Sequence, residues 1–437
     1  MSRADSEISL PFLEPADLIE AEGVELRVQP VEQGAVLHDK LPASSVNLTP
    51  QATYQQADGT VQVWYLRVDY ADVEYMDKLV FCLGEIRDGK WTLPELSSEP
   101  PAWGGVNNIV LRRSPIPSTW GGMTALQVVP DENGFQMLYW DQPGPDAKAG
   151  AIRAFSSDGR DWKKLPGTVF TDYNDCFTLR RERDTDYLYQ QALVPWPNKP
   201  YPDSLYAYKR VIVLRTSTDK LATWTPLDIN RPILEPDDED EPTTEFYSLT
   251  TFRYGRGYAG LLWKYYADPN RPRKHSALFK YELVVSRDGI EWLRPFRNVD
   301  LRFYSFAEPF YQQGKMWFVT QGAHHSEQEG YTLLKGWKQN RMIAVEGAGS
   351  FRTRTFEHSP ESIELDVETS TGWIKVIPCN QAGFPVPGLD PITIKNKNGF
   401  HRLSWDTDKL PDALSLKIML SAETKVYGIK IKQTSAE

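Results

Sequence analysis

The heptapeptide Ser-Ser-Asp-Gly-Arg-Asp-Trp at residues 156–162 has a near copy, Ser-Arg-Asp-Gly-Ile-Glu-Trp, at residues 286–292. Two looser copies end at Trp91 and Trp224, so the four tryptophans are 71, 62 and 68 residues apart. Asp-Gly favours a tight turn, because glycine accepts a positive φ and aspartate caps the turn. Self-similarity at a regular interval is typical of repeat architectures.

A second recurring element precedes each copy of this motif. It is a strand, a turn and a second strand rich in aromatic residues, and it occurs at residues 52–66, 125–140, 176–191, 246–263 and 308–320. The fifth copy has no clean Asp-Gly-Trp partner. Each unit is therefore interpreted as two hairpins, or four strands, which is the content of one blade of a β-propeller.

The repeat predicts an all-β chain with a five-bladed β-propeller over residues 30–350, after an N-terminal extension at residues 1–29. A strand at residues 30–40 is expected to help close the ring on the last blade. The pattern changes after about residue 351, where six short segments follow in fewer than 90 residues. These segments predict a small β-sandwich at residues 351–437, with packing support as its expected role.

Composition narrows the function classes. The net charge of −10 disfavours nucleic acid and anionic membranes as partners. No apolar run is long enough to span a bilayer, and the first ten residues lack the pattern of a secretory leader. We therefore expect a cytoplasmic protein, or a secreted one if a leader had been removed. The widely spaced Cys82, Cys176 and Cys379 predict buried free thiols and no disulfide framework.

Aromatic residues are unusually frequent, with 14 Trp, 21 Tyr and 18 Phe. They suit strands, and their rings also suit the apolar face of a sugar. Together with the two heptapeptides, three further stretches resemble the five-bladed propeller glycoside hydrolases of the invertase-like and arabinanase-like superfamily. These stretches are Gly-Val-Asn-Asn-Ile at residues 105–109, Glu-Phe-Tyr at 245–247, and residues 372–388.

This resemblance implies a carbohydrate substrate and carboxylates on the innermost strands, facing a central funnel. One carboxylic acid protonates the leaving oxygen, and a second carboxylate attacks or activates water. The sequence departs from the invertase-like pattern, since its Asn-Asp-Pro, Arg-Asp-Pro and Glu-Cys motifs are absent and residues 46–54 contain no acid. Candidate residues are therefore assigned by their position within the blades.

Four carboxylates stand at or just before the predicted inner strands. Glu245 opens the inner strand of the fourth blade and is the first choice for general acid. Asp172 and Asp175 hold the matching position in the third blade, and Asp175, which is nearer the strand, is the candidate base or nucleophile. Glu308 opens the inner strand of the fifth blade. The structural alternatives are an ordinary carboxylate at a strand edge and an Asx turn.

Further residues are candidates for substrate binding. Paired amides at Asn107 and Asn108 suit bidentate recognition of hydroxyls, although asparagine also forms turns. Arg112 would suit the carboxylate or sulfate of an acidic sugar. Adjacent residues on a strand point to opposite faces, so at most one of His324 and His325 would face the funnel, where it could bind a sugar hydroxyl or ligate a metal. The remaining candidates for sugar contact are Trp120, Asn174 and Tyr247.

The sequence leaves the cofactor and the function class open. The acidic run at residues 235–241 would suit calcium, but such runs are also solvated loops, and no other cofactor is expected. The leading hypothesis is an exo-acting glycosidase, because a funnel closed at one end accepts a chain terminus. The alternative is a non-catalytic carbohydrate-binding or scaffold propeller, and a lyase on the same fold is a third class. The oligomeric state is not predicted.

Overall fold

The computed structural model describes residues 7–38, 46–69, 79–101, 103–114, 123–172, 174–201, 205–270, 277–321, 332–357 and 360–433. The strands in these ranges form seven sheets, and the helical elements are short 3-10 turns at Pro15–Asp17 and Thr407–Lys409. The predicted all-β class is therefore confirmed. No helix in the described part of the chain is long or apolar enough to span a lipid bilayer.

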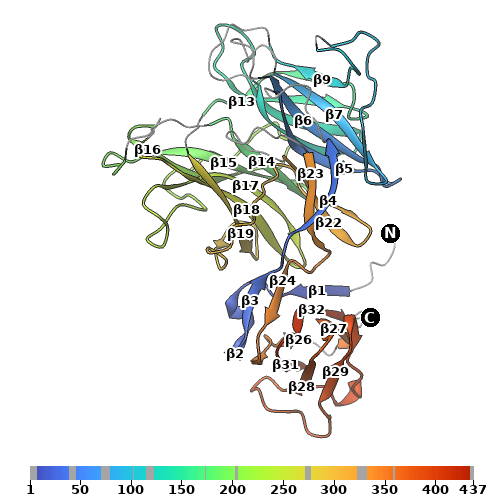
Figure 1. Cartoon of the computed structure of the whole chain (residues 1–437). Helices are drawn as coiled ribbons and strands as arrows, with labels where there is room; N and C mark the ends of the chain where they lie inside the picture. Colours follow the sequence, from blue (N-terminus) through green and yellow to red (C-terminus); the bar gives the residue numbers. More distant parts are fainter. Residues whose placement is uncertain are drawn as a thin grey trace.

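Five sheets follow one another along the chain and form the upper body in Figure 1. The first contains β5 (Val46–Gln55), β6 (Val61–Asp69), β7 (Val80–Arg87), β8 (Lys90–Thr92) and β9 (Ile109–Arg112). The second contains β10 (Thr124–Asp131), β11 (Gly134–Asp141), β12 (Gly150–Ser156) and β13 (Lys163–Phe170). The third contains β14 (Phe177–Glu182), β15 (Thr185–Pro195) and β16 (Tyr208–Ser217).

The fourth and fifth sheets complete this series. The fourth contains β17 (Thr244–Tyr254), β18 (Gly257–Tyr266), β19 (Leu278–Ser286) and β20 (Trp292–Leu293). The fifth contains β21 (Phe310–Gln312), β22 (Lys315–Gln321), β23 (Thr332–Lys338) and β4 (Glu32–His38). Because β4 precedes the first sheet in the chain but pairs with β23, it ties the two ends of the series together, as expected for residues 30–40.

The first strands of these sheets meet around a common centre. Strand β5 contacts β10, β10 contacts β14, β14 contacts β17, and β22 of the fifth sheet contacts β5. The fourth and fifth sheets join through an apolar core in which the rings of Phe252 and Phe318 meet edge to face, 5.1 Å apart. The five sheets thus contact one another in a closed ring, in which β5, β10, β14 and β17 are inner strands and both β21 and β22 of the fifth sheet contact β5.

The repeated heptapeptide fastens neighbouring sheets to one another. In the second sheet, Ser156 Oγ accepts the Gly159 N–H at 2.9 Å. The Gly159 carbonyl then accepts the indole N–H of Trp64, from the first sheet, at 2.9 Å. In the same way, the Gly289 carbonyl of the fourth sheet accepts the hydroxyl of Tyr189, from the third sheet, at 2.8 Å. The motif therefore combines a tight turn with a contact between sheets.

Replacing Gly289 with alanine should cost more stability than replacing Gly89. Both glycines have a positive φ, +76° and +73°, which costs about 1–2 kcal/mol for an L-residue. At Gly289 an added Cβ would also lie 2.6 Å from Arg180 Nη2, whereas nothing lies within 4 Å at Gly89. Because Arg180 is held by Glu182 and Tyr189 and cannot simply move aside, this crowding adds about 1–3 kcal/mol. Thermal unfolding of both variants measures the difference, and equal losses would contradict it.

The remaining two sheets form the lower body in Figure 1. One contains β1 (Glu7–Pro11), β3 (Glu25–Val28), β24 (Ile343–Glu346), β27 (Pro360–Glu368), β30 (Asn398–Arg402) and β32 (Lys425–Gln433). The other contains β2 (Ile19–Glu22), β25 (Gly349–Arg352), β26 (Phe356–Glu357), β28 (Trp373–Cys379), β29 (Ile392–Lys395) and β31 (Ala413–Leu420). Residues from both sheets share one apolar core, which includes Phe351, Leu365 and Ile418.

These pairings divide the chain differently from the predicted limits. The first thirty residues, expected to be an extension, supply β1, β2 and β3 to the two lower sheets, and β24 and β25 begin before the expected boundary at residue 351. The three N-terminal strands have only four or five residues each, which is too short for a clear alternating pattern. Cys82, Cys176 and Cys379 are buried thiols outside any disulfide, as predicted.

Candidate functional site

One glutamine side chain lies across the centre of the ring. Gln127, from β10, donates from Nε2 to the carbonyl oxygens of Gln51 at 2.8 Å and Phe306 at 3.5 Å. Its Oε1 accepts the N–H of Leu179, from β14, at 3.0 Å. Gln127 therefore joins the first three sheets to the connection that precedes β21 of the fifth.

A chain of polar side chains occupies the side where the third sheet begins. Asp172 pairs with the buried guanidinium of Arg215 at 2.6 Å, and Arg215 Nε donates to Gln190 Oε1 at 3.1 Å. Gln190 Nε2 in turn donates to the Asn174 carbonyl at 2.9 Å, and the Asn174 amide donates to Gln191. The ion pair with Arg215 orients the Asp172 carboxylate, although the aspartate side chain is half exposed.

Asp175 and Tyr247 continue this group, which we call the upstream cluster (Asp172, Asn174, Asp175, Gln190, Gln191, Arg215 and Tyr247). The Tyr247 carbonyl accepts a hydrogen bond from Gln191 Nε2 at 2.7 Å. The centre of the Tyr247 ring lies 4.6 Å from that of the Trp263 ring. Burial, together with the nearby Cys176 and Asp175, raises the pKa of the Tyr247 hydroxyl. The charge of Asp175 therefore acts on the phenol of Tyr247, at the junction of the third and fourth sheets.

Glu245, the predicted general acid, has a different environment from the one expected. Its side chain is fully buried, and its Oε1 accepts Lys199 Nζ at 2.6 Å and the Tyr201 hydroxyl at 2.8 Å. Its Oε2 accepts both the N–H and the guanidinium of Arg210, at 3.0 and 2.7 Å. Both carboxylate oxygens are therefore occupied by protein donors, and no direction is left for a substrate. The general-acid role is thus not supported, because the carboxylate serves a buried ion-pair cluster.

Glu308 lies in the connection just before β21, two residues after Phe306. Together with Arg180, near the end of β14, it lines a hollow of about 330 Å³ at the ends of β14 and β17. Burial raises the pKa of the Glu308 carboxyl to about 7, against the lowering effect of the Arg180 charge. The structure therefore gathers Glu245, Asp172 and Asp175 near one junction and places Glu308 elsewhere.

The predicted amide pair belongs to the outer part of the first sheet. Asn108 Nδ2 donates to the Tyr65 hydroxyl and the Leu83 carbonyl, both at 2.7 Å. Asn107 Nδ2 donates to the Glu99 carbonyl at 2.6 Å. Both amides fasten the segment that leads into β9 to neighbouring parts of the first sheet. The expected sugar-binding role is therefore not supported for them. Arg112 is an exposed residue of β9, and Trp120, His324 and His325 lie outside the described residues.

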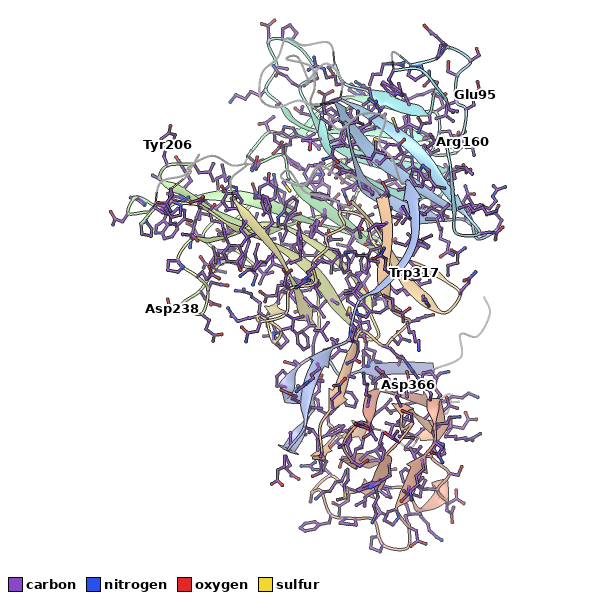
Figure 2. The ribbon with its side chains drawn as sticks, in the orientation of Figure 1. Glu95, Arg160, Tyr206, Asp238, Trp317 and Asp366 are labelled. Carbon is purple, nitrogen blue, oxygen red and sulfur yellow. The ribbon has the colours of Figure 1, made fainter. Side chains whose placement is uncertain are left out.

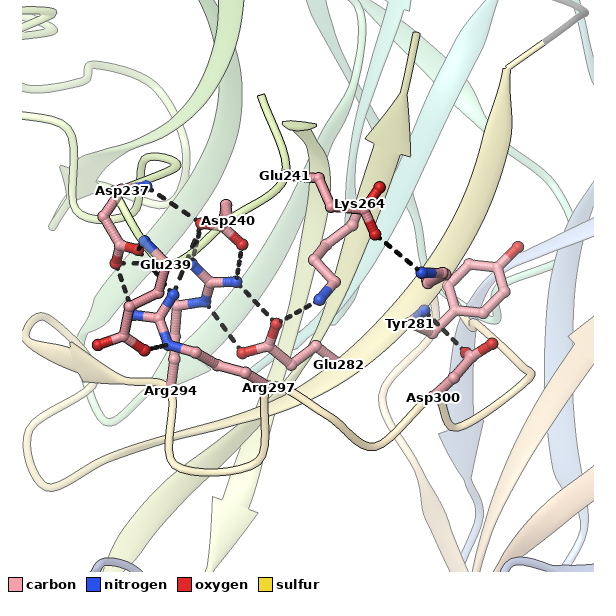
Figure 3. A network of polar contacts seen from close by, with 11 residues as sticks. Asp237, Glu239, Asp240, Glu241, Lys264, Tyr281, Glu282, Arg294, Arg297 and Asp300 are labelled. Atoms are coloured by element: carbon pink, nitrogen blue, oxygen red, sulfur yellow. Dashed lines mark hydrogen bonds and ion pairs between the residues drawn. The ribbon is translucent and has the colours of Figure 1, made fainter. Parts of the chain in front are cut away.

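The acidic run at residues 235–241 forms ion pairs with arginines (Figure 3). Asp240 accepts two bonds from Arg294, at 2.5 and 2.7 Å, and Asp237 accepts a bond from Arg297 at 2.5 Å. Arg294 also pairs with the buried Glu282 at 2.8 Å. Among the described residues, no group of three or more histidine, cysteine or acidic side chains is placed to hold a metal ion.

Calcium should therefore leave the thermal stability of the protein unchanged. A cation at this run would have to displace Arg294 and Arg297 from carboxylates that they already neutralise. Thermal unfolding with millimolar calcium, and again with a chelator, measures this directly. Because a ligand present at about 100 times its Kd adds about 2.7 kcal/mol, a clear rise in the melting temperature with calcium would contradict the expectation.

Comparison with known proteins finds solved structures of glycoside hydrolases at low sequence identity. No family model and no curated protein matches the chain. A family 117 glycoside hydrolase of Zobellia galactanivorans shares 11% identity, covering 71% of this chain and 91% of its own, with a TM-score of 0.47. The GH32 β-fructofuranosidase of Bombyx mori shares 13% identity over 91% and 93% of the two chains, with a TM-score of 0.45. A putative glycoside hydrolase of Bacteroides ovatus shares 15% identity over 75% and 96%, with a TM-score of 0.43.

Proposed function

We propose that this protein is a glycosidase of the five-bladed propeller type, with the two lower sheets as its C-terminal sandwich and the upstream cluster as its active site. The observation that supports this proposal is the pair Asp172 and Asp175 at the start of an inner strand, on a chain of amides. Glycosidic bonds are cleaved by paired carboxylates. Amides that can both donate and accept suit sugar hydroxyls.

The two carboxylates have different proposed roles. Asp172, oriented by its ion pair with Arg215, would position a sugar hydroxyl and stabilise positive charge that develops on the sugar ring. Asp175 would act as the base or the nucleophile, and Asn174 and Tyr247 would contact the substrate. Gln127 supports an exo mode of action, because a side chain across the ring centre leaves room for a chain terminus but not for a polymer that passes through.

A non-catalytic carbohydrate-binding propeller is the second candidate, and the Glu245 cluster favours it. That cluster removes the predicted proton donor from the upstream side of the ring. On this hypothesis the upstream cluster binds a glycan without releasing a product. The two candidates therefore predict the same ligand class and differ only in turnover.

A panel of oligosaccharides and aryl glycosides, read by mass for released sugar, tests the proposal. The matched control is Asp238→Asn, which changes an exposed aspartate on an outer loop of the molecule (Figure 2). Release by the wild type and by this control, but not by an Asp175 variant, is the expected result. Binding on a glycan array without release from any substrate would instead favour the non-catalytic candidate.

A further inference from the structure

The hollow at the ends of the inner strands, which we call the downstream hollow, is a second candidate binding site. Its lining comes from the third, fourth and fifth sheets, and its volume of about 330 Å³ falls at the lower end of the range for small-ligand pockets. It lies at the ends of β14 and β17, whereas the upstream cluster lies at the starts of these strands. It is lined by Arg180, Arg181, Glu182, Arg183, Phe252, Arg253, Glu308, Pro309 and Tyr311.

Two buried polar groups of this hollow lack partners in the described part of the protein. Arg180 is 3% exposed, and its guanidinium lies over the rings of Tyr187 and Tyr258, at 4.5 and 4.1 Å. Its Nη atoms bond to Glu182 and Tyr189, but its Nε–H has no acceptor. The buried Oε1 of Glu308 likewise has no partner. A buried donor without an acceptor costs about 1–3 kcal/mol, which a bound ligand would recover.

The charges around the hollow favour an anion. Glu182 is the only acid there that pairs with the lining arginines, and it receives bonds from both Arg180 and Arg253. Arg181 pairs with Asp186 outside the hollow. Arg183 is exposed on a turn, and no ion pair to it occurs among the described residues. Positive charge therefore exceeds negative charge at the mouth of the hollow.

Aromatic and apolar side chains form the other part of the lining. Tyr311 is 39% exposed, and Phe252 and Pro309 lie with it in the hollow. A bare ion would leave these surfaces in water, whereas the apolar face of a sugar ring would cover them. A ligand that matches both parts carries an oxyanion on a sugar ring.

We propose that the downstream hollow binds a sugar acid, whose carboxylate meets Arg180 Nε–H and Arg183 and whose ring lies against Tyr311. The proposal is independent of the glycosidase proposal, because the two sites lie at opposite ends of β14 and β17. A carboxylate suits arginine, whose planar donors match its two oxygens. The Glu308 carboxyl completes the site as a donor to the ligand while it keeps its proton.

The state of Glu308 gives the site a predicted pH dependence. Its carboxyl faces Arg180 and Glu182 from the third sheet, Arg253 from the fourth and Tyr311 from its own sheet. With its pKa raised to about 7, Glu308 is neutral below that pH and can donate to a bound carboxylate. Above it, the ionised carboxyl repels the ligand. Binding should therefore be strong at pH 6 and weaken at pH 8.

Titration calorimetry with galacturonate, its neutral counterpart galactose, and inorganic sulfate tests the proposal. Galacturonate should bind at least about tenfold more tightly than either of the others, since it alone offers both charge and ring. Arg183→Gln should weaken galacturonate binding by about tenfold, whereas the control Arg231→Gln, on an outer loop, should change it less than twofold.

The pH series separates this mechanism from simple charge attraction. From pH 6 to pH 8 the wild type should lose about tenfold in affinity, while Glu308→Gln should change less than twofold, because the amide cannot ionise. Equal binding of galactose and galacturonate would overturn the proposal, and so would sulfate binding as tight as that of galacturonate. No detectable galacturonate binding at pH 6 in folded wild-type protein would also overturn it.

Discussion

Replacing Asp175 with asparagine should lower the rate of sugar release by at least about a thousandfold while the protein remains folded. Asparagine has the same shape, so the bond from its backbone N–H to Asn174 Oδ1, 2.9 Å in the wild type, is kept. It is a poor base and a poor nucleophile, so the step that forms or hydrolyses the glycosyl bond loses its carboxylate. The initial rate on the best substrate of the panel measures the loss.

Two further variants make this result specific to Asp175. Asp172→Asn should have a smaller effect on turnover, because it removes an orienting charge and leaves the buried Arg215 without its counter-ion. Asp238→Asn should leave the rate unchanged. An Asp175→Asn protein that retains wild-type turnover would move the active site away from the upstream cluster, whereas loss of turnover together with loss of the folded state would assign Asp175 a structural role.

The architecture could be predicted because its determinants are local. The Asp-Gly turns and aromatic hairpins repeat within short stretches, and they are the segments that form the second and fourth sheets around Gly159 and Gly289. The N-terminal strands could not be predicted in the same way. Strand β3, for example, has four residues, and its position is fixed by pairing with β24, which comes more than three hundred residues later in the chain.

The candidate site was harder to predict, because side-chain partners come from distant parts of the chain. The position of Glu245 at the start of an inner strand was predicted correctly, but its neighbours Lys199 and Arg210 come from the preceding sheet and its connection. Asn108 was predicted to face a ligand and instead bonds to Tyr65 and Leu83. Glu182 was missed, although the arginines on either side of it in the run Arg-Arg-Glu-Arg at residues 180–183 are a visible signal.

The Glu245 cluster leads to the largest stability effect that we expect from a single charge. In Glu245→Gln, Lys199 and Arg210 would lose the carboxylate that both of them bind while they stay buried, since their side chains are 2% and 3% exposed. Removing one partner of a buried ion pair costs about 3–5 kcal/mol. The midpoint of thermal unfolding should therefore fall by about 5 °C or more. Glu235→Gln, which changes a half-exposed partner of Lys209, should change the midpoint of thermal unfolding very little.

The same variant decides between two explanations of Glu245. A structural carboxylate predicts a large loss of stability, with turnover per folded molecule close to that of the wild type. A general acid predicts the opposite pattern, in which stability is kept and turnover falls, and in which substrates with a good leaving group are affected least because they need no proton. Measuring both quantities on natural and aryl substrates separates them, and a stable but inactive Glu245→Gln protein would restore the acid role that its contacts argue against.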